Sequence, residues 1–206
     1  MVITMRKFLF TLLLISSSIC LIAQKGETWL GLHSGFGVQT IVQTKKNIPN
    51  FSPSSSGARE NGLSFSYLFT KNIAVYLEGA VKQHWQEYYS GQNHVSATIN
   101  TGRYSIGMRM PFMVSPNGFE LVVDYGYYYE REYLRFNENY DPTIDNLKPP
   151  LINNHGLLAA FGVNFRFSKE QRLVPSIHFK VNMDVGSSNA VKRHSHLAVF
   201  GINYRL

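Results

Sequence analysis

The sequence predicts an all-β fold: an eight-stranded antiparallel transmembrane β-barrel whose strands follow one another as an up-and-down meander. Eight segments alternate between apolar and polar residues with a period of two, as strands with two different faces do. Short connections follow the second, fourth and sixth segments, and longer ones follow the first, fifth and seventh. Charged residues make up only 16% of the chain, against about 25% in ordinary soluble domains.

The chain begins with the pattern of a secretory signal peptide. Arg6 and Lys7 precede a short apolar run, and Ala23 supplies a small residue at a cleavage position. The apolar run is too short for a comfortable helical membrane span. We therefore expect a signal peptide at 1–23 and an outer-membrane barrel at 24–206.

Cysteine usage narrows the chemistry of the mature chain. The only cysteine, Cys20, lies within the predicted signal peptide. Ile19 before it is not the small residue that a lipid-attachment cysteine needs, so we reject a lipoprotein. The mature chain is then expected to have no disulfide, no thiolate nucleophile and no cysteine metal ligand. Its basic excess is spread along the chain, which does not favour nucleic acid as a partner.

The first four strands each carry one apolar face. We expect these strands at about 28–42, 62–69, 73–89 and 96–110, with a polar loop at 43–60 between the first two. Tight turns and a short loop join the others. The apolar faces consist of Leu30, Leu32, Phe36 and Val38, of Leu63, Phe65, Tyr67 and Phe69, of Ile73, Val75, Leu77 and Val81, and of Tyr104, Ile106, Met108 and Met110.

The last four strands repeat the pattern. We expect them at about 119–136, 155–167, 176–184 and 196–206, with polar loops at 137–154 and 186–195. The turn before the fifth strand is marked by Pro116, Asn117 and Gly118. The apolar faces include Phe119, Leu121, Val123, Tyr125, Tyr127 and Tyr129, then Leu157, Ala159, Phe161, Val163 and Phe165, then Ile177, Phe179, Val181 and Met183, and finally Ala198, Phe200, Ile202, Tyr204 and Leu206.

Periodicity alone does not say which face points inward, but the composition of the two faces does. Tyr and Phe gather near strand ends on the apolar face, as interfacial girdles of a membrane barrel require. Glycines recur on the charged face, where the narrow interior of eight strands needs small residues. We therefore expect the apolar face to point outward and the charges to point into the barrel.

The expected interior contains charges of both signs. Because an unpaired buried charge is costly, these side chains should pair with one another and form a structural plug. A proton or ion path through the same network is the alternative. The predicted barrel-interior charge network consists of Glu78, Lys82, Arg103, Arg109, Glu120, Asp124, Glu130, Arg166, His178, Lys180, Asp184 and Arg205.

The last strand ends in Gly201, Tyr204 and Leu206, which is similar to the C-terminal sorting signal of outer-membrane barrels. Two positions depart from that signal: Phe200 occupies a commonly polar site, and the last residue is Leu and not Phe. With the face pattern, the mature chain resembles small barrels of the OmpA/OmpX-like group and the outer-membrane barrels of Bacteroidota. The resemblance implies the Gram-negative outer membrane, where lipid, lipopolysaccharide and the barrel-assembly machinery are the expected partners.

Two groups of residues invite a catalytic or metal-binding reading. His94 and Ser96 could form the base and nucleophile of a lipid A-modifying enzyme, but their flanking residues do not match such enzymes. His194 and His196 could share a metal, yet no third ligand is evident. We expect loop polar residues in both cases, and an aromatic girdle for Tyr127 and Tyr129, with Tyr140 left open.

The resulting expectation is a non-enzymatic outer-membrane protein without cofactors. Its role would be structural or adhesive, with polar loops displayed outside, or that of an accessory subunit docked to other envelope proteins. Two other classes stay open: a lipid A-modifying enzyme, and a soluble lipocalin-like carrier with an internal cavity. The inward Arg and Glu residues count against the carrier.

Overall fold

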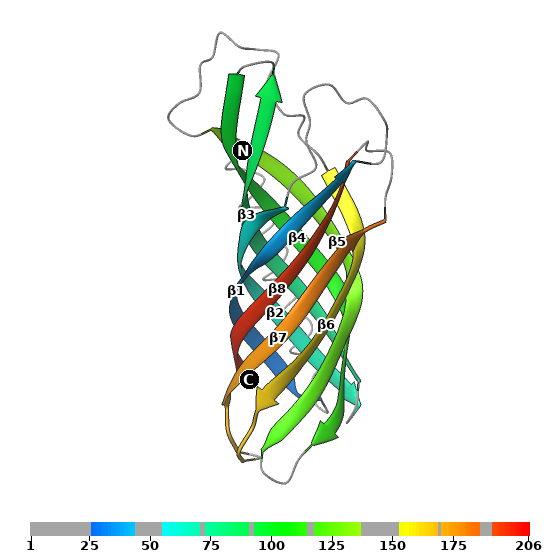
Figure 1. Ribbon diagram of the computed structural model, residues 1–206. Coiled ribbons are helices and arrows are strands. Elements are labelled where there is room, and N and C mark those ends of the chain that lie inside the picture. The colour runs from blue at the N-terminus through cyan, green and yellow to red at the C-terminus, as the bar shows by residue number, and fades with distance from the viewer. Residues whose placement is uncertain are drawn as a thin grey trace, which may run out of the picture.

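The computed structural model describes residues 26–43, 55–70, 73–90, 93–114, 118–136, 153–168, 170–185 and 191–206. The chain in these ranges forms one closed β-barrel in which each strand pairs with its sequence neighbours and the last strand pairs with the first (Figure 1). All pairs are antiparallel. The predicted eight-stranded meander is therefore confirmed. The predicted signal peptide at 1–23 lies outside the described residues.

The strands are longer than the sequence pattern alone indicates. The largest difference is at β2, which begins at Ser55 and not near Gly62, because its first residues pair with the far end of β1, Thr40 opposite Ser55. The strands are β1 (Thr28–Gln43), β2 (Ser55–Thr70), β3 (Ile73–Ser90), β4 (Asn93–Val114), β5 (Phe119–Phe136), β6 (Asn153–Phe165), β7 (Leu173–Asp184) and β8 (Val191–Arg205).

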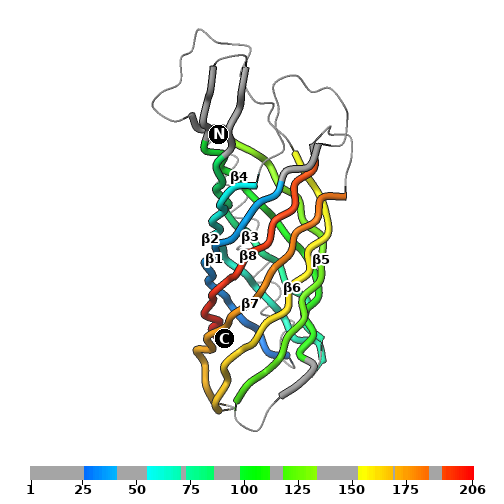
Figure 2. Tube along the Cα trace, in the orientation of Figure 1, coloured from blue at the N-terminus to red at the C-terminus, as the bar shows by residue number. Residues whose placement is uncertain are grey.

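The strands are strongly tilted, as Figures 1 and 2 both show. The register gives the reason. Following paired residues once around the barrel leads from Trp29 on β1 back to Gln39 on β1, ten residues further along. For eight strands, a stagger of this size corresponds to a tilt of about 40°. The interior of such a barrel is just wide enough to be filled by side chains.

The connections differ between the two ends of the barrel. At the end where the chain finishes they are 71–72, 115–118 and 166–172; at the other end they are 44–54, 91–92, 137–152 and 185–190. We call these the short-turn end and the long-loop end. The β3–β4 hairpin extends beyond its neighbours, since the β2 pairing stops at His84 and the β5 pairing at Ala97, and it projects from the long-loop end (Figure 1).

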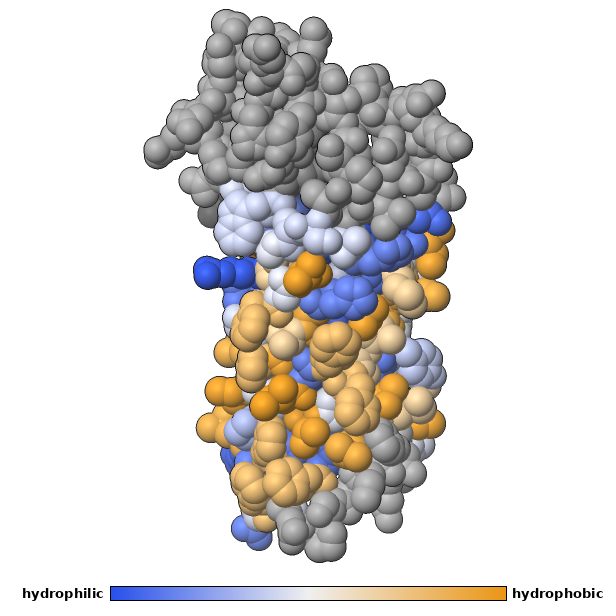
Figure 3. All heavy atoms as spheres, viewed as in Figure 1, coloured by the Kyte–Doolittle hydropathy of each residue, from blue (hydrophilic) through white to orange (hydrophobic). Residues whose placement is uncertain are grey.

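Burial separates the two faces in the sense expected for a membrane barrel. Along β6 and β7 exposed and buried residues alternate almost without a break. Large apolar residues are exposed, for example Leu32 at 61%, Phe161 at 51% and Ile202 at 53%, while Lys82 and Arg103 are buried. Figure 3 shows apolar side chains covering the middle and lower part of the visible face, with polar ones above them. The charged side chains therefore fill the inside of the barrel.

None of the described residues belongs to a helix of the length and apolarity that a membrane span needs.

Candidate functional site

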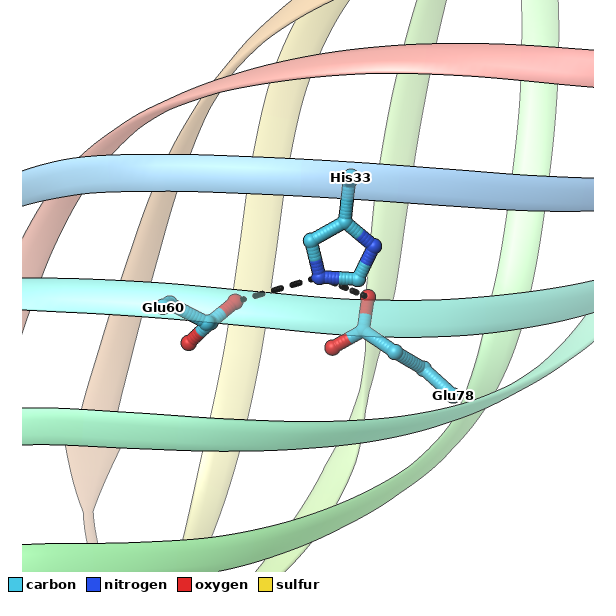
Figure 4. A group of neighbouring side chains, drawn as sticks. All are labelled: His33, Glu60 and Glu78. Atoms are coloured by element: carbon cyan, nitrogen blue, oxygen red, sulfur yellow. Dashed lines mark ion pairs between the residues drawn. The ribbon is translucent and has the colours of Figure 1, made fainter.

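The interior is crossed near its middle by a cluster of five side chains from five strands. Arg103 of β4 donates from one Nη to Glu60 Oε1 and Glu78 Oε1, both at 2.5 Å. Lys180 of β7 reaches the same two oxygens at 2.9 Å and 3.0 Å. His33 Nε2 lies 3.5 Å from Glu60 and 3.9 Å from Glu78 (Figure 4). We call these five residues the central cluster.

The charges of the central cluster balance. Its two carboxylates face the guanidinium of Arg103 and the amine of Lys180, and Glu60 and Arg103 are fully buried. Removing such groups from water costs several kcal/mol each, and good pairing geometry offsets that cost. The arrangement is therefore that of an ion-paired plug held by strands on opposite sides of the barrel.

A second pair lies toward the short-turn end. The Arg109 guanidinium donates Nε–H and Nη–H to the two oxygens of Asp124, each at 2.8 Å. This bidentate geometry is the strongest form of an Arg–carboxylate pair. His178 Nδ1 lies 3.8 Å from Asp124. Tyr76 is buried beside Arg109, whose guanidinium carbon lies 5.8 Å from the ring centroid.

Two further pairs lie toward the long-loop end. Lys82 Nζ donates to Glu130 Oε1 at 2.7 Å, with both side chains almost fully buried. Arg193 pairs with Glu132, again with both buried. His84 and Gln39, which are fully buried, add a hydrogen bond of 3.3 Å between β3 and β1. The ion pairs thus continue along the interior on the long-loop side of the central cluster.

The short-turn end holds a cavity of about 610 Å³. Arg166 and Arg205 approach the same oxygen of Glu27, at 3.5 Å and 3.4 Å, and the Arg166 guanidinium lies over the Trp29 ring at 5.5 Å. Glu120, also at the cavity wall, accepts a hydrogen bond of 2.8 Å from Asn164. We call this space the vestibule.

The vestibule does not continue as a wide passage. A second cavity, lined by the central cluster's His33, Glu78 and Lys180 and by Asp124 and His178, measures only about 30 Å³. That is room for about one water molecule. The described side chains therefore close the barrel interior between the vestibule and the long-loop end.

Three side chains of the central cluster satisfy the distance requirement for a metal site. Ligand atoms of His33, Glu60 and Glu78 all lie within 4.8 Å of one another (Figure 4). The charge balance argues against a metal there. Arg103 and Lys180 already neutralise both carboxylates, so a divalent cation would add two uncompensated charges in a buried position. The residues present do not fit a metal centre.

The structure places the predicted network residues inside the barrel and divides them into groups. Glu78, Arg103 and Lys180 meet in the central cluster, Arg109, Asp124 and His178 meet below it, and Lys82 pairs with Glu130. Asp184 is buried at the long-loop end of β7. Three others, Glu120, Arg166 and Arg205, line the vestibule.

Sequence reasoning missed several partners of this network. The expectation that Glu60 lies in a polar loop at 43–60 is wrong, because β2 already begins at Ser55. Extending the alternation of Ser64 and Ser66 backward by two more steps would have pointed Glu60 inward. The other missed partners are His33, Glu132, Arg193 and Glu27.

The candidate catalytic and metal-binding histidines lie elsewhere. His94 and Ser96 belong to β4, opposite Tyr89 and Glu87, so the short loop expected at His94 is wrong; their side chains lie outside the described residues. On β8, His194 and His196 share the outward face, and His196 stacks on Phe179 at 6.4 Å. Among the described side chains no third metal ligand joins these two histidines.

Comparisons with known proteins place the fold. No family model matches the chain, and no curated protein sequence matches it. Among solved structures it is similar to the outer membrane protein OprG from Pseudomonas aeruginosa, with a TM-score of 0.56, 14% identity, and 88% of this chain and 95% of that chain covered. It is also similar to Neisserial surface protein A, with a TM-score of 0.57, 10% identity, and 87% and 97% covered. The fold is thus that of the small eight-stranded barrels of outer membranes.

Proposed function

We propose that this protein is a non-enzymatic outer-membrane barrel. It acts as a rigid structural or adhesive unit that displays its long-loop connections outside the cell, or as an accessory subunit of an envelope complex. The observation that carries the proposal is the inverted barrel: exposed apolar residues surround an interior filled with buried ion pairs. Such a molecule is stable only where hydrocarbon replaces water around it.

A closed interior supports a display role over a transport role. Porins leave an aqueous channel, which requires many more strands than eight. Here the central cluster and the Lys82–Glu130 pair cross the interior between the vestibule and the long-loop end, and the small cavity beside the cluster has room for about one water molecule. A porin-like permeability is therefore not part of the proposal.

The proposed partners follow from the location. Outer-membrane lipid and lipopolysaccharide contact the outward face, and the barrel-assembly machinery recognises the end of β8. Tyr204 and Leu206 point outward with 37% and 64% of their surface exposed, while Gly201 faces Ser176 inside. These exposed positions are compatible with a sorting signal at Gly201, Tyr204 and Leu206. Other envelope proteins are the candidate partners of the long-loop end.

The proposal is tested by heat modifiability and conductance together. The mature chain is folded into lipid vesicles and run on a gel with and without boiling, and its conductance is measured in a planar bilayer. We expect a mobility shift on boiling, protease-resistant strands and no porin-sized current. A protein that stays soluble without detergent, or that passes a steady porin-sized current, contradicts the proposal.

Neither alternative class is supported by a specific observation. A lipid A-modifying activity would depend on His94 and Ser96. The test compares lipid A from cells that make the wild type with lipid A from cells that make Ser96→Ala. Modified lipid A with the wild type and unmodified lipid A with the variant would establish the activity. A lipocalin-like carrier needs an enclosed apolar cavity, whereas the middle of the described interior is occupied by ion pairs and the vestibule wall contains Glu27, Arg166 and Arg205.

A further inference from the structure

In the described part of the barrel the inner face carries charges of both signs, whereas the outer face carries few charges and only positive ones. Every acidic residue on a strand whose side chain is described points inward: Glu60, Glu78, Glu120, Asp124, Glu130, Glu132 and Asp184. The outward faces of the described strands carry charges of one sign only, from Arg59, Arg131 and Lys192. The outer surface of the described barrel wall is therefore purely cationic.

These cations gather at one end of the barrel. On β5 the outward residues are apolar or aromatic from Phe119 to Tyr129, and the next outward residue is Arg131. On β8 the outward residues are apolar from Tyr204 back to Ala198, and the next ones are His196, His194 and Lys192. Each sequence of outward residues turns basic on approaching the long-loop end.

Two more strands, β2 and β6, follow the same rule. On β2, Arg59 precedes the apolar stretch that begins at Leu63, and on β6, His155 directly precedes Leu157. Figure 3 shows polar residues above the apolar belt on the visible face. The outer cation ring is our name for the three outward cations of this end together with the three outward histidines beside them: Arg59, Arg131, Lys192, His155, His194 and His196.

The ring lies at the height where a hydrocarbon layer should end. From Phe119 to Tyr129 the strand rises by about 25 Å along the barrel axis, given about 3.3 Å per residue and a tilt of about 40°. That height equals the apolar band of about 25 Å that outer-membrane barrels carry. Arg131, one outward position further, therefore lies at the level of the lipid headgroups.

Aromatic contacts mark the same boundary. The Arg131 guanidinium lies over the Tyr133 ring at 5.6 Å, and His155 stacks on Tyr127 at 5.8 Å. Aromatic rings with a polar end are typical of the interface between hydrocarbon and water. Arg131 and His155 are thus held at an interface by contacts within the barrel wall.

We propose that the outer cation ring binds the phosphate groups of the phosphorylated glycolipid in the outer leaflet. The guanidinium and ammonium groups of the ring lie on β2, β5 and β8; β1 separates β2 from β8, and β5 lies across the barrel from β1. A single protein partner touches one side, whereas a lipid headgroup layer surrounds the barrel. Guanidinium and ammonium groups are suited to phosphate. This inference rests on the proposed outer-membrane location and adds the lipid class that the barrel recognises.

The test compares two triple variants in detergent micelles. The ring variant carries Arg59→Gln, Arg131→Gln and Lys192→Gln. The matched control removes three cations from the short-turn connections: Lys71→Gln, Lys169→Gln and Arg172→Gln. All three proteins are first checked for heat modifiability, so that a wild type that fails to fold as a barrel is recognised as evidence against the proposed location and not against the ring. Binding of diphosphorylated and monophosphorylated lipid A is then measured by microscale thermophoresis.

The wild type and the control are expected to prefer the diphosphorylated lipid and to bind it more weakly at high salt, since exposed charges are screened. The ring variant is expected to bind it about 10- to 100-fold more weakly and to lose the preference. Equal affinity of the wild type and ring variant overturns the proposal. So does an equal loss in the control, and so does equally tight binding of phosphatidylglycerol, which carries phosphate without the sugar.

Discussion

The buried pair between Lys82 and Glu130 offers the sharpest energetic test of the interior. Its atoms are 2.7 Å apart, and both side chains are almost fully buried. With an effective dielectric constant of about 20, two unit charges at this distance attract by about 6 kcal/mol, most of which offsets the cost of removing both ions from water. Lys82→Met removes the attraction and leaves the Glu130 carboxylate without its nearest cation.

We expect Lys82→Met to lower the free energy of unfolding by about 3–5 kcal/mol, because it leaves a buried charge unbalanced. The double variant, Lys82→Met with Glu130→Leu, should recover most of that loss, because replacing a whole buried pair by apolar residues is often neutral. Both are measured by reversible urea unfolding in lipid vesicles, with Glu130→Leu completing the double-mutant cycle. If Lys82→Met costs less than about 1 kcal/mol, or the double variant is no better than the single, the pair is solvated and the interior is not closed there.

Three further predictions test other parts of the barrel. Phe161→Arg, in the middle of the outward apolar face, should lower the free energy of unfolding in lipid vesicles by about 2–4 kcal/mol, and Tyr129→Arg, near the edge of that face, by about 0–1 kcal/mol. Equal losses would show that the apolar face is not in hydrocarbon. Gly118→Ala should lower the free energy of unfolding by roughly 1–3 kcal/mol. Gly118 has a φ of 90°, and a Cβ there would lie 2.7 Å from the backbone of the β6–β7 connection. An unchanged unfolding midpoint would refute this prediction. Arg109→Lys should cost about 1.5–3 kcal/mol because Lys cannot make both hydrogen bonds to Asp124, and full stability of Arg109→Lys would mean that the bidentate geometry is unimportant.

The face of each strand could be predicted from the sequence because it depends on a local property, the alternation of side chains. Ile177, Phe179 and Met183 are exposed, and His178 and Lys180 between them are buried, as their order along β7 predicts. The alternation of faces also holds where glycines or tyrosines interrupt the apolar pattern, because the period of two does not depend on residue type.

Strand ends and charge partners could not be predicted in the same way. The polar composition of 43–60 predicts a loop. The start of β2 is set instead by its pairing with β1, where Ser55 lies opposite Thr40, and this pairing places Glu60 on the inner face of the barrel. The partners of Arg103 come from β2 and β3, and Lys180 reaches them from β7. Such pairs depend on the stagger of the closed barrel, which no single segment encodes.

The central claim is that the apolar face points into lipid and the charged face into a closed interior. The most direct test uses the absence of cysteine from 24–206 to attach a spin label at one residue after another, from Ala198 to Asn203 on β8, in the protein folded into vesicles. Labels at Ala198, Phe200 and Ile202 are expected to be accessible to oxygen dissolved in the bilayer and not to a water-soluble nickel reagent. If the nickel reagent reaches those three positions instead, the barrel is surrounded by water and the account is wrong.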